Sequence, residues 1–130
     1  GHPTTVKKMS NDGVTGNYRS SEGITGEAIW GKRAKWMDLY GNIGNEKISL
    51  VICDHPKNLS YPTYWHARGY GLFAANPFGV KDFTAGKEEL NYVISAGKSL
   101  TLRYRIVISS GSHLTDMEIN VFADNFASKY

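Results

Sequence analysis

The sequence lacks the features that several classes of protein require. One cysteine excludes an intrachain disulfide. No apolar stretch approaches the roughly 20 residues that cross a bilayer, so no membrane-spanning helix is expected. No signal peptide opens the chain, and the start at Gly without Met leads us to expect that an export signal has been removed. The basic residues are scattered, without the dense stripe that a nucleic-acid partner needs.

What the chain does contain is typical of one ordinary globular domain. Its 130 residues suffice for a single core, and we treat residues 1–130 as one domain. A hydrophobic share of 41% and a charged share of 21% exclude wholesale disorder. The 14 glycines and the many aromatic residues favour strands and tight turns over helices. The buried run before Cys53 predicts that this thiol behaves as a small core hydrophobe.

The periodicity predicts a mainly β fold. Residues 1–28 read as largely loop with one short strand. A hairpin is expected around the turn at residues 41–45, because strand-like segments flank it. The strand signals are, in chain order, residues 34–40, 46–53, 65–75, 89–94 and 100–108.

The last two elements are the most clearly patterned. In the segment 100–108, Thr101, Arg103 and Arg105 share a face that we expect to be solvated, whereas Leu100, Leu102, Tyr104 and Ile106 share the opposite face. An amphipathic helix is expected at 115–129, capped by Thr115, with one apolar face. That face comprises Ile119, Phe122, Ala123 and Phe126. The fold class predicted is an antiparallel β-sandwich with one C-terminal α-helix.

The segment 54–79 is the expected functional centre. Asp54 and His55 follow a buried strand directly, and side chains at such positions are held rigidly yet reach the surface. If residues 65–71 form a strand, His66, Arg68 and Tyr70 project from one face, and burying them without partners would be costly. A cleft lined by these side chains is therefore predicted. The alternative is that Asp54 pairs with Arg68 while both histidines make ordinary hydrogen bonds.

Three kinds of site suit these residues. A metal would need His55 and His66 to converge with Asp54 or Glu22, but their spacing matches no recognised ligand pattern, so neither a metal nor a cofactor is expected. Acid–base chemistry could use His55 and His66, with Asp54 as the orienting group. Recognition without chemistry would use aromatic faces and directional hydrogen bonds, a mixture that suits sugars. The residues assigned to substrate binding are Arg68, Trp65, Tyr70, Asn76, Glu22, Arg33 and Trp36.

Four motifs occur in a distinctive order: S-E-G at 21–23, W-G-K-R-A-K-W at 30–36, D-H-P at 54–56 and W-H-A-R-G-Y-G-L-F-A-A-N-P-F-G at 65–79. In this order and spacing they resemble the C-terminal part of the PmoA-like family. The resemblance implies a bacterial, often exported protein encoded among sugar-processing genes. It further implies a periplasmic or secreted location, or otherwise a cytoplasmic one. The family takes its name from a methane oxygenase subunit, but that activity would need membrane-spanning helices, which this chain lacks.

Family members are about twice as long, with a second D-H-P-type motif in an N-terminal half. The resemblance therefore implies that this chain is part of a larger protein and carries only part of the family site. Our leading hypothesis is a carbohydrate-associated domain of a sugar-acting, glycoside hydrolase-like enzyme. The alternatives are a non-catalytic glycan-binding module, or an assembly domain that packs on the missing half or forms an oligomer. In the first two, the partner is a glycan or another small molecule.

Overall fold

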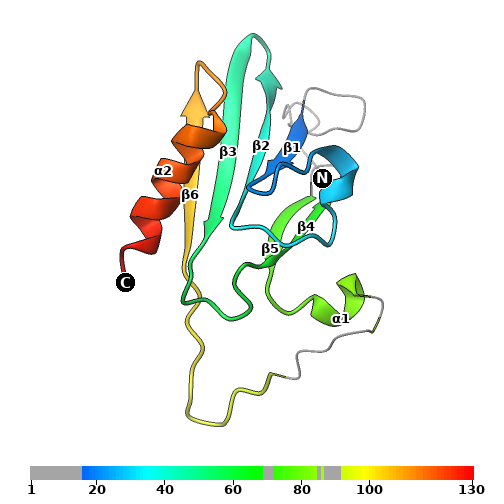
Figure 1. Ribbon diagram of the computed structural model, residues 1–130, viewed down its shortest axis with the longest axis vertical. Helices are drawn as coiled ribbons and strands as arrows, with labels where there is room; N and C mark the ends of the chain where they lie inside the picture. Colours follow the sequence, from blue (N-terminus) through cyan, green and yellow to red (C-terminus); the bar gives the residue numbers. More distant parts are fainter. Residues whose placement is uncertain (1–15, 69–71, 85, 87–91) are drawn as a thin grey trace, which may run out of the picture.

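The computed structural model describes residues 16–68, 72–84, 86 and 92–130 (Figure 1). Its elements are β1 (Asn17–Ser20), the 3-10 helix η1 (Gly26–Ile29), β2 (Trp36–Ile43), β3 (Glu46–Asp54), β4 (Tyr64–Arg68), β5 (Leu72–Asn76), α1 (Val80–Phe83), β6 (Tyr104–Ser110) and α2 (Asp116–Ala127). A four-stranded antiparallel sheet has the order β1-β2-β3-β6, and β4 and β5 form a separate two-stranded ribbon. The predicted mainly β class with a C-terminal helix is confirmed.

The β2–β3 hairpin forms where the sequence predicts one. Ile43 pairs with Glu46, so the connection is a two-residue turn at Gly44 and Asn45, shorter than the turn predicted. Gly44 has a φ of 63°, a left-handed conformation that glycine adopts without steric cost.

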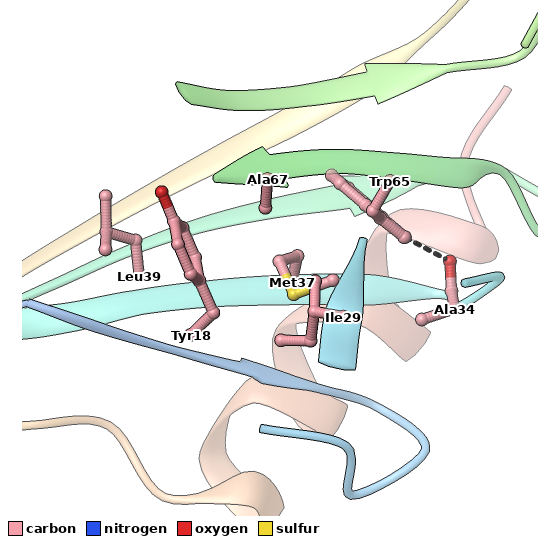
Figure 2. Close-up of a cluster of buried hydrophobic side chains, with 7 residues drawn as sticks. All are labelled: Tyr18, Ile29, Ala34, Met37, Leu39, Trp65 and Ala67. Atoms are coloured by element: carbon pink, nitrogen blue, oxygen red, sulfur yellow. Dashed lines mark hydrogen bonds between the residues drawn. The ribbon is translucent and has the colours of Figure 1, made fainter. Parts of the chain in front are cut away.

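The ribbon covers one face of the sheet and forms the first core cluster. Figure 2 shows this cluster between β1 and β2 on one side and β4 on the other, with Trp65 and Ala67 projecting from β4. Trp65 is fully buried, and its Nε1–H donates to the carbonyl oxygen of Ala34 at 2.8 Å. Tyr18 reaches across from β1, and its hydroxyl donates to the carbonyl oxygen of Leu72 at 2.8 Å.

Helix α2 covers the other face and forms the second core cluster. Thr115 and Glu118 make a reciprocal capping box, which fixes the start of the helix. Ile119 and Phe126 are buried against Trp36, Val51 and Cys53. The expectation for Cys53 is confirmed, since the thiol is fully buried and burial raises its pKa to about 11. Phe122 was also predicted to belong to the apolar face of the helix, but it lies at the edge of that face and is 39% exposed.

One predicted strand is wrong, and another lies partly outside the described residues. The segment 65–75 is not one strand but parts of two, β4 and β5, which pair with Trp65 opposite Ala75. The prediction missed the reversal because the alternation continues on both sides of it; residues 69–71, between β4 and β5, lie outside the described residues. Of the strand predicted at 89–94, residues 92–94 lack strand structure and 87–91 are not described.

The last strand begins later than predicted and has the opposite sidedness. Residues 100–103 are not in a strand, and β6 starts at Tyr104. Arg105, predicted to be solvated, lies on the face covered by α2, with its guanidinium 4.9 Å from the ring centroid of Phe126. Ile106 and Ile108 pair with Ile52 and Leu50 on the other face and are 63% and 71% exposed. That face lacks cover because the ribbon is only two strands wide and packs over β1 and β2.

Candidate functional site

Asp54 at the end of β3 organises the loop that follows it. Its Oδ1 accepts from the backbone N–H of His55 at 3.0 Å and from Nδ2 of Asn58 at 2.7 Å, and its Oδ2 accepts from the N–H of Thr63 at 2.9 Å. Burial raises the pKa of this carboxyl, and the hydrogen bonds from Asn58, Thr63 and His55 oppose that rise. The carboxylate is therefore the centre of a structural network, with three donors converging on two oxygens.

Asn58 links this loop to the residue just before β6, the edge strand that pairs with β3. Its Oδ1 accepts from the backbone N–H of Arg103 at 2.7 Å, and its Nδ2 donates to the carbonyl oxygen of the same residue. The side-chain amide of Asn58 thus makes with Arg103 the two hydrogen bonds that the backbone of a neighbouring strand would make. Asn58 is 6% exposed, so these bonds are made away from bulk water.

His55 is 1% exposed and has both ring nitrogens occupied by backbone groups. The N–H of Lys57 donates to Nδ1 at 3.1 Å, which places the ring proton on Nε2, and Nε2–H donates to the carbonyl oxygen of Lys129 at 2.5 Å. The ring packs edge-on against Phe126, with a centroid distance of 4.9 Å. Through these contacts, His55 connects the end of β3 to the residues that follow α2.

His66 lies in a different environment. It alternates with the buried Trp65 and Ala67 on β4, so it projects from the outer face of the ribbon and is half-buried. Trp30, at the end of η1, packs edge-on against it with a centroid distance of 6.2 Å. The two histidines therefore belong to opposite layers, and the predicted pairing of His55 with His66 around one ligand gains no support.

The two histidines should respond differently to truncation. We expect His55→Ala to lower the free energy of unfolding by about 2–3 kcal/mol, because it removes a ring that is 1% exposed together with its bonds to the N–H of Lys57 and the carbonyl oxygen of Lys129. His66→Ala, on a half-buried outer face, should cost less than about 1 kcal/mol. Urea denaturation followed by circular dichroism measures both. Equal losses in the two variants would contradict the structural role of His55.

Arg33, Tyr64 and Asn76 continue the outer face of the ribbon beyond His66. The guanidinium of Arg33 lies 5.0 Å from the ring centroid of Tyr64. Its Nε and Nη2 donate to the carbonyl oxygens of Pro62 and Ser60 at 2.9 and 3.1 Å. Asn76 pairs with Tyr64 across the ribbon, and its Oδ1 accepts from the N–H of Phe78 at 3.2 Å. Arg33 is exposed and retains N–H groups beyond the two that hold the loop.

The remaining predicted substrate-binding residues lie elsewhere. Trp36 and Trp65 are 1% and 0% exposed, and Trp36 donates from Nε1 to Oδ1 of Asn120 at 2.8 Å. Neither ring presents a face to a ligand, so the proposed stacking role does not agree with their burial. Glu22 is an exposed turn residue. The side chain of Arg68 and all of Tyr70 lie outside the described residues.

Sequence reasoning missed two outer aromatic residues. Trp30 was part of a candidate segment, but Trp36 was preferred as the ligand contact. Phe78 follows β5 and is 52% exposed, while its neighbour Pro77 is buried. No sequence signal distinguishes it from a core phenylalanine in a turn.

A second buried carboxyl was also missed. Asp38 on β2 is fully buried, and its Oδ2 lies 3.1 Å from Nη2 of Arg19. Burial raises its pKa to about 7, with Arg19 opposing and Asp116 adding to the rise. Arg19 also contacts the start of α2, with Nε 2.8 Å from Oδ1 of Asp116 and Nη2 donating to the carbonyl oxygen of Leu114 at 2.8 Å. This cluster joins the sheet to α2.

The described residues set limits on other kinds of site. Within residues 16–68, 72–84, 86 and 92–130, no three His, Cys, Asp or Glu side chains are grouped so that they could hold a metal ion. Across the same part of the chain, no helix has the length and apolar character needed to cross a membrane.

The family of the chain follows from comparison with known families. A family described as "Family of unknown function (DUF6807)" matches residues 5–124. The chain belongs to this family. The match spans the Asp54 network, the ribbon and α2 as far as residue 124. No curated protein and no solved structure matched the chain.

Proposed function

We propose that this domain binds a carbohydrate on the outer face of the β4–β5 ribbon, as a recognition module of a PmoA-like, sugar-acting protein. The observation that carries the proposal is the pairing of Trp30 with His66 on that face, at a centroid distance of 6.2 Å. An aromatic ring beside a polar ring offers both an apolar surface and hydrogen-bonding atoms, the combination that a sugar requires.

The neighbouring groups on the ribbon extend the same surface. Arg33 supplies exposed N–H donors beside the ring of Tyr64. Asn76, on the adjacent strand, stands opposite Tyr64. Phe78, two residues further along the chain, is 52% exposed. The resemblance to a family encoded among sugar-processing genes favours a glycan over other small polar ligands.

Recognition fits these contacts better than catalysis by this chain alone. Hydrolysis of a glycoside needs two groups, one that protonates the leaving oxygen and one that acts as base or nucleophile on the other side of the bond. Of the three residues predicted to be catalytic, Asp54 and His55 are buried at 3% and 1% exposure and bonded to the backbone. Only His66 lies on the proposed surface. An enzyme in which another segment supplies the second group remains the alternative.

The test is a screen of glycans and glycosides against the chain and its Trp30→Ala and His66→Ala variants. We expect a sugar that binds the unmodified chain to bind each variant at least about 10-fold more weakly, the loss typical of removing one aromatic contact. Tyr92→Ala is the matched control, because Tyr92 is 45% exposed and lies far along the chain in the connection to β6.

Each result of the screen has a clear meaning. Loss of binding in Tyr92→Ala to the same extent would remove the ribbon from the site. Cleavage of a glycoside by the chain would replace recognition with catalysis. Absence of any sugar response, from this chain and from a longer version of the protein, would overturn the carbohydrate assignment.

A further inference from the structure

The guanidinium of Arg33 is held in one orientation on the outer face of the ribbon. Its Nε and Nη2 donate to the carbonyl oxygens of Pro62 and Ser60 at 2.9 and 3.1 Å, and its central carbon lies 5.0 Å from the ring centroid of Tyr64. Most exposed arginine side chains sample several rotamers, and ordering them opposes ligand binding. The contacts of Arg33 remove much of that opposition, and the side chain is exposed where a ligand can reach it.

The loop that supplies these carbonyls is itself fixed by Asp54. Asn58 and Thr63, at either end of the loop, donate to the Asp54 carboxylate at 2.7 and 2.9 Å. Between them, Ser60 has a φ of 62°, a left-handed conformation that a residue with a Cβ adopts at a steric cost. Strained residues of this kind persist where the surrounding contacts hold them, and they are common at ligand-binding sites. The strained carbonyl group here is one of the two that orient Arg33.

One edge of the Arg33 guanidinium remains available to a ligand. The loop carbonyls use one N–H of Nε and one of Nη2, which leaves both N–H groups of Nη1 and the second of Nη2. One N–H from each terminal nitrogen points in the same direction, so the pair can donate in parallel to the two oxygens of a carboxylate. Within the part of the chain that the structure describes, the ion pairs with carboxylates are made by Arg19, so no described carboxylate occupies this edge.

The charge around Arg33 is also unbalanced. Arg33 pairs with Tyr64, so residues 31–34 run along β4 like a third strand of the ribbon. The residues of this three-stranded layer, 30–34, 63–68 and 72–78, include Lys32 and Arg33 but no Asp or Glu. A surface with basic residues and no acidic ones attracts an anionic ligand and disfavours a cationic one.

The aromatic pair of the proposed sugar site lies within reach of this edge. Tyr64, which Arg33 covers, and His66 lie two residues apart on the same face of β4, a separation of roughly 7 Å. Trp30 packs edge-on against His66. One sugar ring with a carboxyl substituent can span that separation, so a single acidic sugar residue can contact the guanidinium and the aromatic pair together.

We propose that the sugar bound on the ribbon is an acidic one, and that Arg33 receives its carboxylate while the Trp30–His66 pair contacts its ring. This inference rests on the proposed function and adds the chemical class of the ligand, which is a uronic acid or an oligosaccharide that contains one. A neutral sugar lacks the charge-assisted, parallel hydrogen bonds to the guanidinium, which are stronger than hydrogen bonds between neutral groups.

Calorimetric titration of matched oligosaccharides tests the proposal on the unmodified chain. The panel pairs oligogalacturonides, oligoglucuronides and alginate oligosaccharides with their carboxyl-reduced forms, in which a hydroxymethyl group replaces only the carboxylate. We expect an acidic oligosaccharide to bind, and its reduced form to bind at least about 10-fold more weakly. Raising the NaCl concentration from about 0.1 M to about 1 M should weaken binding of the acidic form alone, because salt screens exposed charges.

Substitutions of Arg33 test the residue itself. Arg33→Gln should weaken binding of the acidic form at least about 10-fold and bring it close to that of the reduced form. Arg33→Lys keeps the charge but not the parallel donors, so its loss should be intermediate. Lys47→Gln is the matched control, since it removes the same charge from an exposed residue on the face of the sheet away from the ribbon and should leave binding unchanged. Circular dichroism checks that each variant keeps its fold.

The outcomes separate this inference from the proposed function. Equal affinity for acidic and reduced forms, with binding still lost in Trp30→Ala, would overturn the acidic ligand and leave the carbohydrate assignment in place. Tighter binding of a sulfated oligosaccharide without carboxylates would also overturn it, as would equal losses in Lys47→Gln and Arg33→Gln. Absence of binding by every sugar in the panel and in the wider screen would overturn both proposals.

Discussion

Replacing Asp54 with alanine should lower the free energy of unfolding by on the order of 4 kcal/mol. The substitution removes the acceptor of three donors: the backbone N–H groups of His55 and Thr63 and Nδ2 of Asn58. Each donor left buried without a partner costs about 1–3 kcal/mol, and the three costs together give the expected loss. That loss is a large share of the roughly 5–15 kcal/mol that stabilises a typical domain. Urea denaturation at pH 7 measures it.

Asp124→Ala is the control for this experiment. Asp124 lies on the exposed side of α2, so its removal should change the free energy of unfolding by no more than about 0.5 kcal/mol. A loss below about 1 kcal/mol in Asp54→Ala would mean that water reaches the three donors, and the Asp54 network would not hold the loop.

The second large effect is a dependence of stability on pH that comes from Asp38. In the folded chain its pKa is about 7, against 3.8 for an unperturbed aspartate. Between these values the folded state holds a proton that the unfolded state has released. The free energy of unfolding therefore falls as the pH rises from about 4 to about 7, and this contribution levels off above that range. The expected fall is on the order of 3 kcal/mol.

The measurement is a series of urea denaturations from about pH 4 to about pH 8 on the chain and on Asp38→Asn. The amide does not titrate, so the fall should be much smaller in the variant, with the difference between the two curves concentrated below about pH 7. Asp54, whose pKa is also raised by burial, contributes in the same direction and remains in both proteins. Parallel curves for the two proteins would show that Asp38 is already ionised throughout this range.

The fold could be predicted wherever one local pattern decided the structure. The β2–β3 hairpin followed from a glycine-rich turn between two strand-like segments, and α2 from the capping residue Thr115 and the helical spacing of its apolar residues. β6 shows the limit of that reasoning. Alternation separates two faces, but which face is buried depends on whether α2 or the ribbon lies over it. Arg105 and Ile106 were therefore assigned to the wrong environments.

The role of the residues around Asp54 could not be predicted from the sequence. The strand end after Cys53 does carry a dense polar network, as the sequence suggested. However, His55 is bonded to the carbonyl oxygen of Lys129, and Asn58 in the same loop is bonded to Arg103, and both partners lie far along the chain. No local pattern reveals those partners. Trp30 and Trp65 illustrate the same limit, because aromatic composition does not distinguish a core ring from a surface ring.

The amide of Asn58 has a consequence for producing the protein. Residues 58–60 read Asn-Leu-Ser, the acceptor pattern for N-linked glycosylation in eukaryotic secretory pathways. A glycan on Nδ2 would take the place of a hydrogen that now bonds to Asp54 or to the carbonyl of Arg103, at a position only 6% exposed. Modification of the nascent chain would therefore compete with closure of the loop onto β6. Expression in a bacterial cytoplasm leaves this side chain free to make its three bonds.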